Sequence, residues 1–309
     1  MAAETPTAAL GARLFQRLTI LIPYVWLFCL FLLPFLIVFR ISLSVLEFGS
    51  PPYVPQFDLS KGWTAFREDL AMLNVENYTF LATDALYRNA YISSILIASV
   101  STFFTLLIGF LMAYGMARAP EGWRPILLML VILPFWTSFL IRVYAWIGIL
   151  KPEGLLNQLL LWLGVIDTPL TILNTNTAVY IGVVYSYLPF MILPIYATLE
   201  KLDYSLIEAA QDLGCTAIGA FWKITVRLAL PGIIAGSMLV FIPTVGEFVI
   251  PDLLGGSQTL MIGKVLWTEF FNNSDWTIAS ALAILLLLVL VVPIVFFQNA
   301  QAKAAGQGQ

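Results

Sequence analysis

Six long segments of mostly apolar residues constrain this chain more than any other feature of its sequence. A helix needs about 20 consecutive apolar residues to cross the hydrocarbon core of a bilayer, which is about 30 Å thick. The segments that meet this requirement are residues 18–39, 89–117, 125–150, 177–199, 228–250 and 278–297. Because a backbone surrounded by lipid must satisfy its own hydrogen bonds, each segment is expected to be helical. The sequence therefore predicts an all-α, polytopic membrane protein with six transmembrane helices.

The composition excludes several classes of function. Hydrophobic residues make up 60% of the chain and charged residues 11%, which is outside the range of soluble globular domains. The chain has no histidine, and its two cysteines are Cys29 and Cys215, so imidazole chemistry, a disulfide framework and a thiolate metal site are excluded. No phosphate-binding loop pattern occurs either. We therefore expect no catalytic residues, no metal site and no cofactor bound by this chain; membrane lipid is an expected partner and nucleic acid is not.

The basic residues before the first apolar segment predict its orientation. Arg13 and Arg17 precede the segment and no small-residue cleavage site follows it, as expected of an uncleaved anchor. Since positively charged flanks stay on the inner side, the N-terminus is predicted to be cytoplasmic, and six spans place the C-terminus on the same side. The expected organisation is residues 1–89 (N-terminus, first span and extracytoplasmic loop), residues 90–298 (five further spans) and residues 299–309 (a cytoplasmic tail).

A short acidic segment, SLIEAAQDLG (205–214), lies between two apolar segments. Ser205 and Glu208 fit the capping box that begins a helix, and Gly214 suits the left-handed position that ends one. A helix lying on lipid usually presents lysine or arginine, whereas this one presents carboxylates and the small residues Ala209 and Ala210. The pattern favours a short helix that docks into a groove of another protein, although Glu208 as a simple cap is an equally supported reading.

The same segment resembles the cytoplasmic loop of the permeases of binding-protein-dependent ABC importers of type I. The pattern E-A-A-x3-G-x9-I-x-[LV]-P is matched by Glu208, Ala209, Ala210, Gly214 and Ile224. It departs at its end, where Arg227 stands in place of the proline.

This resemblance implies that the loop, residues 200–231, contains a coupling helix that seats in a separate ATPase subunit. The residues implied in this coupling are Ser205, Glu208, Ala209, Ala210, Asp212 and Gly214. It also implies that residues 90–298 form a type-1 ABC transporter transmembrane domain. The implied partners are a second similar permease, two ATPase subunits that bind ATP and magnesium, and an extracytoplasmic solute-binding protein. The implied location is the bacterial cytoplasmic (inner) membrane.

Three further stretches narrow the resemblance. LPFWTSFLIRVYAWIGIL (133–150), PGIIAGSMLVFIPTVGEFVIPDLLGG (231–256) and MIGKVLW (261–267) are similar to permeases of spermidine and putrescine importers, most of all to the putrescine type. Import of a polyamine is what this similarity implies. The alternatives are a permease of the same family for another solute, such as a ferric ion or an amino acid, an ion-coupled secondary transporter, and an intramembrane enzyme.

Two ionisable residues fall inside predicted spans, Arg142 and Glu247. A lone charge in the bilayer centre costs at least ~2.5 kcal/mol on insertion scales, so each should face a cavity or a partner. One interpretation places Glu247 and Asp252 in the substrate pathway together with the rings of Trp136 and Tyr144, which lie eight residues apart and hence on one helical stripe. The other makes Arg142 a structural charge that neutralises Glu247, or lets both reach the outer interface.

Prolines and small residues predict an interruption in the fifth span. Pro243 and Gly246 come just before Glu247, and Pro251 follows it. This pattern is typical of a discontinuous span, which exposes helix ends near the membrane midplane, or of an ordinary proline kink. The tyrosines of the fourth span, Tyr180, Tyr185 and Tyr187, are expected to serve packing or interface contacts only.

Overall fold

The computed structural model describes residues 19–57, 62–257 and 259–306, and helices account for most of them. Arg13, Arg17 and residues 307–309 lie outside the described residues, so the predicted orientation remains a prediction. The strands within the described ranges are β1 (Val45–Leu46) and β2 (Tyr53–Val54), which pair antiparallel. The predicted all-α class is confirmed.

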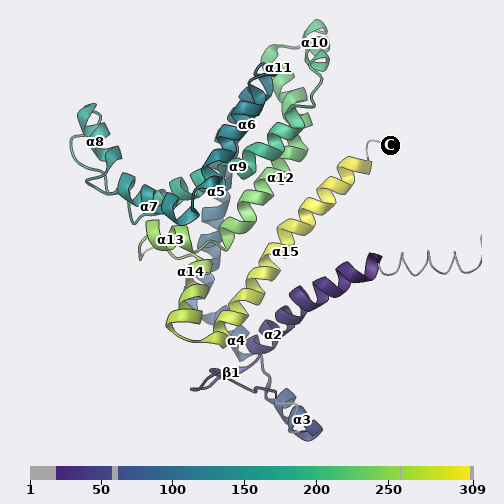
Figure 1. Ribbon diagram of the computed structural model, residues 1–309, viewed down its shortest axis with the longest axis vertical. Helices are drawn as coiled ribbons and strands as arrows, with labels where there is room; N and C mark the ends of the chain where they lie inside the picture. Colours follow the sequence, from purple (N-terminus) through teal and green to yellow (C-terminus); the bar gives the residue numbers. More distant parts are fainter. Residues whose placement is uncertain (1–18, 58–61, 258, 307–309) are drawn as a thin grey trace, which may run out of the picture. The chain divides into compact units, whose positions relative to one another are not determined.

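Figure 1 shows the helical elements along the chain. In chain order they are η1 (Phe28–Leu32), α2 (Leu33–Ser42), α3 (Gly62–Met72), α4 (Glu76–Thr83), α5 (Ala85–Arg118), α6 (Arg124–Ile132), η3 (Leu133–Trp136), α7 (Phe139–Leu150), α8 (Leu155–Trp162), α9 (Asn176–Leu199), α10 (Ser205–Asp212), α11 (Ala217–Ala220), η4 (Phe221–Thr225), α12 (Val226–Val245), α13 (Val249–Leu254), α14 (Ile262–Trp267), η5 (Thr268–Asn272) and α15 (Trp276–Gly306).

Five of the helices are long and apolar enough to cross a membrane, and a sixth span is formed if one bent pair counts as a single crossing. The five, counted over the described residues, are Thr19–Ser42, Ala85–Arg118, Asn176–Leu199, Ala217–Val245 and Trp276–Val295. They agree with five of the six predicted segments to within a few residues, apart from the fifth segment, which begins eleven residues earlier than predicted.

The third predicted span is not one straight helix. The segment Arg124–Trp136 and the segment Phe139–Trp162, which contains α7 and α8, are bent by 89° at the residues between them. Pro134 lies in the 3₁₀ turn η3, and Thr137 after it is extended, with φ −93° and ψ 151°. The expectation of a continuous helix over 125–150 is therefore wrong, because a proline followed by an extended residue ends the helix.

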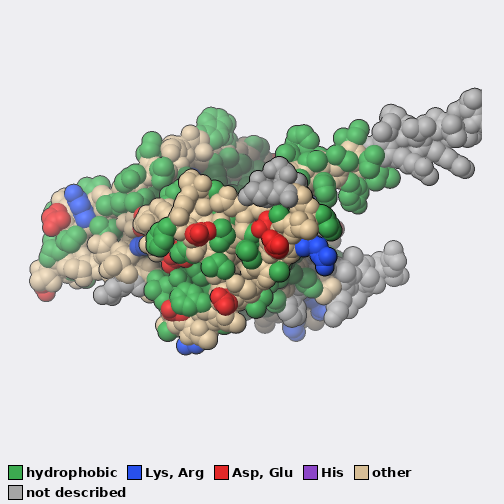
Figure 2. All heavy atoms as spheres, turned by 90° about the horizontal axis from the view of Figure 1, so that it is seen from below, with side chains coloured by type: hydrophobic (Ala, Val, Ile, Leu, Met, Phe, Trp, Pro, Cys, Tyr) green, Lys and Arg blue, Asp and Glu red, His purple; other side chains and the backbone are tan. Residues whose placement is uncertain are grey.

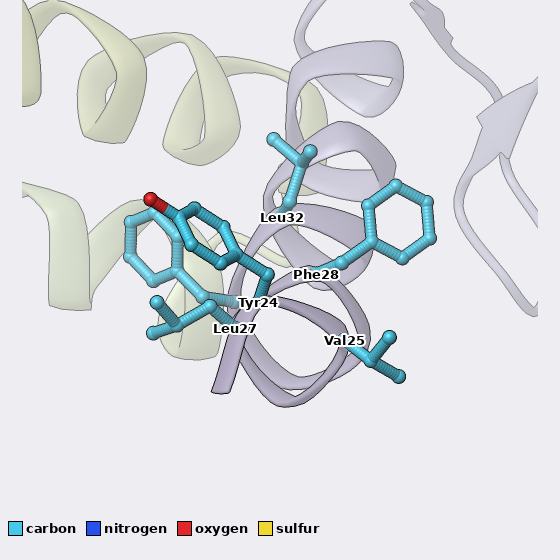
Figure 3. A pocket seen from close by; sticks show the side chains of 6 residues that line it. Tyr24, Val25, Leu27, Phe28 and Leu32 are labelled. Atoms are coloured by element: carbon cyan, nitrogen blue, oxygen red, sulfur yellow. The ribbon is translucent and has the colours of Figure 1, made fainter. Parts of the chain in front are cut away.

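The chain divides into two compact units, each described here by itself. One unit comprises Met1–Leu81 and Glu269–Leu285. Its first span is exposed over most of its length, as expected of a helix surrounded by lipid, and is buried at its end, at Ile41 and Ser42; it carries many hydrophobic side chains (Figure 2). Figure 3 shows side chains projecting from this helix in several directions around a shallow apolar groove that they form themselves: Tyr24, Val25, Leu27, Phe28 and Leu32.

The loop that follows the first span is folded rather than extended. The hydroxyl groups of Ser42 and Tyr78 lie 2.6 Å apart, and the Asn77 amide donates to the carbonyl oxygens of Ser42 and Ser44, each at 2.9 Å. The Arg40 guanidinium donates to the Tyr53 hydroxyl at 3.2 Å. These contacts hold α4 against the end of the first span.

The other unit comprises Ala82–Thr268 and Leu286–Gln309, and its centre is the packing of α5, α9 and α12 against one another. Close approach of α12 to α9 depends on Gly232, where an added Cβ would lie 2.5 Å from the Pro194 carbonyl oxygen. Helices α10 and α11 lie at one end of this group, and α13 and α14 lie at the other (Figure 1). The unit therefore presents two sites that sequence analysis singled out at its opposite ends.

Candidate functional site

Helix α10 contains the predicted coupling segment, but its N-terminus differs from the prediction. The Asp203 carboxylate accepts a hydrogen bond from the Ser205 N–H at 2.9 Å, and Ser205 is already the first helical residue. The capping box predicted for Ser205 and Glu208 is therefore wrong, because Asp203 takes that role two residues earlier. Hydrogen bonds from the backbone and the side chain of Ser205 stabilise the charged carboxylate and hold the pKa of the Asp203 carboxyl below its ordinary value.

The C-terminus of α10 follows the prediction. Gly214 has φ +83°, in the left-handed region. The Cys215 N–H donates to the Ala210 carbonyl at 2.9 Å, and the Gly214 N–H donates to the Gln211 carbonyl at 2.8 Å. This pair of bonds is the Schellman arrangement, in which glycine ends a helix without the steric cost of a Cβ. The helix is consequently well defined at both ends.

One side of α10 is fixed to the unit and the other is free. Ile207 is buried with Leu202 and Ala220 in a small core. The Tyr204 hydroxyl donates to the Ala117 carbonyl at the end of α5, at 3.4 Å. The exposed residues of the helix and its C-terminal turn are Ser205, Leu206, Glu208, Ala209, Gln211, Asp212, Leu213 and Gly214, with Ala210 half-buried. Leu213, in the turn that ends the helix, is 90% exposed.

Arg227, which replaces the proline of the motif, lies in an unbroken helix. Thr216 caps α11 by accepting from the Gly219 N–H at 3.2 Å, and the chain then continues through the π-helical turn η4 into α12. Arginine keeps the backbone N–H that proline lacks, and the helix runs over Ala217–Val245 with Pro231 and Pro243 inside it. The segment that leaves the loop is thus a single long helix.

At the other end of this helix the predicted interruption is confirmed. Helix α12 ends at Val245 and α13 begins at Val249, with Glu247 between them. The carboxylate of Glu247 accepts from the N–H groups of Phe248 at 3.1 Å and Val249 at 3.0 Å. It also accepts from the Tyr187 hydroxyl at 2.5 Å, and Glu247 is only 9% exposed. Glu247 therefore caps α13 and links it to α9.

Asp252 lies on α13 and is much more exposed than Glu247. Its side chain is 57% exposed and pairs with the Lys264 ammonium on α14 at 3.3 Å. Lys264 also donates to the Gly256 carbonyl at 2.9 Å. Phe248 stacks on Trp267 with ring centroids 4.4 Å apart. These contacts join α13, its following turn and α14 into one small assembly.

The structure does not bring Trp136 and Tyr144 together as predicted. The third span is broken between them, so they do not share a helical stripe, and they are 78% and 58% exposed respectively. Arg142 and Glu247 form no ion pair in the described structure, so their mutual neutralisation is also wrong. The Arg142 guanidinium lies instead over the rings of Phe135, at 5.1 Å, and Phe139, at 5.7 Å.

Sequence reasoning missed Tyr187, which it assigned to packing. Its partner Glu247 is 60 residues away in the chain, and nothing in the local pattern around either residue indicates the contact. Among the described residues there is also no group of three His, Cys, Asp or Glu side chains that could hold a metal ion.

Comparison with known proteins identifies relatives over nearly the whole chain. Residues 7–305 match the family model described as binding-protein-dependent transport system inner membrane component. The chain is 43% identical over 229 residues to the spermidine/putrescine transport system permease protein PotB of Escherichia coli (strain K12), covering 74% of this chain and 83% of that protein. PotB of Haemophilus influenzae is 39% identical over 286 residues, covering 93% of this chain and 94% of that protein.

A solved structure shares the fold. One chain of a bacterial alginate ABC transporter, crystallised in complex with its alginate pentasaccharide-bound periplasmic protein, superposes with a TM-score of 0.69. The match covers 95% of this chain and 96% of the other at 17% identity, a level at which the likeness concerns the fold alone.

Proposed function

Because this chain belongs to the family of binding-protein-dependent transport system inner membrane components, we propose that it is the subunit through which an ABC importer moves polyamines into the cytoplasm. The family consists of transport permeases, so the chain is a multi-pass inner-membrane permease and not an enzyme. It binds no cofactor, and ATP is hydrolysed by a separate subunit. Family membership also excludes the ion-coupled transporter and the intramembrane enzyme considered from the sequence.

One observation supports the proposed class of substrate. Two permeases named for spermidine and putrescine are 43% and 39% identical to this chain over 74% and 93% of its length. Identity at this level supports a shared class of substrate, and the names of the relatives include both polyamines. The proposed substrates are therefore putrescine, which the sequence favoured, and spermidine.

The proposed assembly contains a second similar permease, two ATPase subunits and an extracytoplasmic polyamine-binding protein. The exposed face of α10, with Glu208, Ala209, Asp212 and Leu213, is the part that enters a groove of the ATPase. Carboxylates beside apolar residues fit a groove that offers both basic and apolar contacts. Nucleotide binding shifts the equilibrium between inward- and outward-facing states only because the nucleotide binds one of them better.

The proposed topology places both termini and residues 200–231 in the cytoplasm. Residues 1–89 then form the N-terminus, the first span and the extracytoplasmic loop, residues 90–298 the transport domain, and residues 299–309 the tail. Helices α13 and α14 lie at the extracytoplasmic end of the domain in this arrangement.

The proposed substrate pathway passes the segment between Glu247 and Asp252. Asp252 is the exposed carboxylate on this segment, and an ammonium group of the substrate would compete with Lys264 for it. Glu247 positions α13, which carries Asp252. Trp136 and Tyr144 expose aromatic rings, which can attract alkylammonium groups, and we include them in the proposed pathway.

Reconstitution tests the substrate class directly. The complex, with its own partner permease, ATPase and binding protein, is placed in proteoliposomes, and uptake of labelled putrescine and spermidine is measured together with ATP hydrolysis. We expect the loaded binding protein to stimulate both activities with a polyamine and not with an amino acid or a ferric ion. Stimulation by one of those solutes and by neither polyamine would refute the proposed substrate.

Cysteine crosslinking tests the coupling face separately. Ala209→Cys is introduced where Cys29 and Cys215 have been replaced by serine, and crosslinking to the ATPase is measured in the membrane. The matched control is Ser257→Cys, an exposed residue beyond α13 at the opposite end of the domain. We expect capture of the ATPase from residue 209 and not from residue 257, and equal capture would contradict the proposal.

A further inference from the structure

We propose that Tyr187 is a positioning residue that connects the break in the fifth span to the break in the third, so that the two breaks change conformation together during transport. The inference requires the chain to work as a permease and does not depend on which solute it carries. It assigns a role to a residue that sequence analysis placed in the packing of α9.

The two breaks lie on segments that pack on one another. In the third span the helix stops at Trp136 and restarts at Phe139, and in the fifth it stops at Val245 and restarts at Val249. The restarted helices α7 and α13 are in contact, and both contact α9. A broken helix leaves N–H and carbonyl groups without helical partners, and lipid offers no replacement. Other side chains must therefore satisfy these groups.

The polar part of the connection is centred on Glu247. Its carboxylate satisfies the N–H groups of Phe248 and Val249, at 3.1 Å and 3.0 Å. Tyr187 donates its single hydroxyl proton to the same carboxylate at 2.5 Å, the length of a strong charge-assisted bond. Glu247 is 9% exposed, so water does not compete effectively for these bonds. The start of α13 is thus fixed to α9 through one side chain.

The aromatic part continues from Tyr187 to the other break. The rings of Tyr187 and Phe190 lie 6.1 Å apart, and Phe190 meets Phe135 edge-to-face at 5.1 Å with an interplanar angle of 89°. Both separations lie in the range of attractive ring pairs. Phe135 comes just before the break in the third span.

Arg142 extends the contact across that break. It lies on α7, after the break, and its guanidinium is 5.1 Å from the ring of Phe135, which lies before it. Its Nε is buried without a hydrogen-bond partner among the described residues. The guanidinium also lies 5.7 Å from the ring of Phe139 on its own helix, so rings on both sides of the break contact this cation. The series Glu247, Tyr187, Phe190, Phe135, Arg142 is therefore continuous.

Helix α9 can deform between the two parts of this series. Pro189 lies between Tyr187, which contacts the fifth span through Glu247, and Phe190, which contacts the third. A proline inside a helix removes one hydrogen bond and permits bending at that point. A bend at Pro189 would turn Tyr187 relative to Phe190. It would thereby move the segments at both breaks at the same time.

The test uses a reporter on each broken span of the complete complex. Ala145→Cys on α7 and Ser257→Cys after α13 are exposed positions, introduced separately where Cys29 and Cys215 are serine. Maleimide labelling rates are compared without nucleotide and with ATP and vanadate, in the absence of transported solute. We expect the rates at both positions to change severalfold on trapping.

Tyr187→Phe removes the hydroxyl and keeps the ring, and Tyr185→Phe on the same helix is the matched control. In Tyr187→Phe, the nucleotide-dependent change in labelling rate should become at least threefold smaller at one of the two positions, 145 or 257, than at the other. Assembly and basal ATPase activity should be retained. Tyr185→Phe should leave both changes intact.

Two results would overturn the inference. The first is no labelling change at either position in the unsubstituted complex, and the second is equal behaviour of Tyr187→Phe and Tyr185→Phe. Because labelling needs nucleotide but no solute, a wrong substrate assignment would leave these results unchanged, and the two proposals fail separately.

Discussion

Replacing Glu247 by Gln and by Ala distinguishes a helix cap from a substrate ligand. Glutamine keeps one carbonyl oxygen for the N–H groups of Phe248 and Val249, and its amide can donate to the Tyr187 oxygen. The three hydrogen bonds therefore survive, but each changes from a charged to a neutral bond. The difference between these classes is about 1 kcal/mol per bond, so Glu247→Gln should destabilise the fold by ~3 kcal/mol at most.

Alanine leaves all three donors without an acceptor. A buried unsatisfied donor costs ~1–3 kcal/mol, so the three together amount to ~3–9 kcal/mol in a site that is 9% exposed. For a cap, we therefore expect Glu247→Gln to retain a substantial part of transport and Glu247→Ala to lose nearly all of it. If Glu247 instead binds the substrate through its negative charge, transport should be lost equally in both variants.

The assay measures uptake and thermal unfolding of the purified complex for the same samples. We expect the midpoint of unfolding to fall in the order unsubstituted, Glu247→Gln, Glu247→Ala, and uptake to follow it. Asp252→Asn is the control, because Asp252 lies on the same segment but is 57% exposed, and it should leave the midpoint unchanged. Equal loss of uptake in Gln and Ala variants with unchanged midpoints would refute the cap and indicate direct contact with the substrate.

Three further predictions concern other parts of the transport domain. Gly214→Ala should weaken the end of α10 by ~1–2 kcal/mol, because φ +83° is unfavourable for a residue with a Cβ, and crosslinking of residue 209 to the ATPase should fall. Gly232→Ala should cost ~1–3 kcal/mol through overpacking of α12 on α9, seen as a lower yield of folded permease, whereas Gly148→Ala on α7, where an added Cβ meets nothing within 4 Å, should not. The depressed pKa of Asp203 means that its stabilising effect is present above the ordinary carboxyl pKa and is lost as the pH falls through the lowered value. Crosslinking at residue 209 should therefore decline at acid pH in the protein that keeps Asp203. In the Asp203→Asn variant, crosslinking should not depend on pH in this way.

The sequence predicted the features that depend on local residue types. Apolar length located the helices, because a bilayer imposes a minimum span, and Gly214 located the end of α10, because its backbone needs a left-handed residue. The interruption after Val245 was also anticipated from Pro243 and Gly246. In each case the physical cause lies within a few residues of the feature.

The features that were missed have competing or distant causes. The apolar stretch over 125–150 predicts one span with a bend at Pro134, but its composition does not indicate that the chain turns by 89° there. Asp203 and Ser205 both offer a side-chain oxygen to the start of α10, and Asp203 is the one that caps. The contact of Tyr187 with Glu247 exists only when α9 and α12 pack together, so no local pattern predicts it.

The unbroken helix Ala217–Val245 fixes the angular phase between its two ends. Its 29 residues extend over roughly 43 Å, and outside the π-helical turn η4 each residue contributes a rotation of about 100°. Inserting or deleting one residue anywhere along it would turn the Glu247 segment to a different side relative to α10, even if every contact residue were kept. The number of residues between α10 and the Glu247 segment therefore matters for transport as much as the identity of the residues at the two sites.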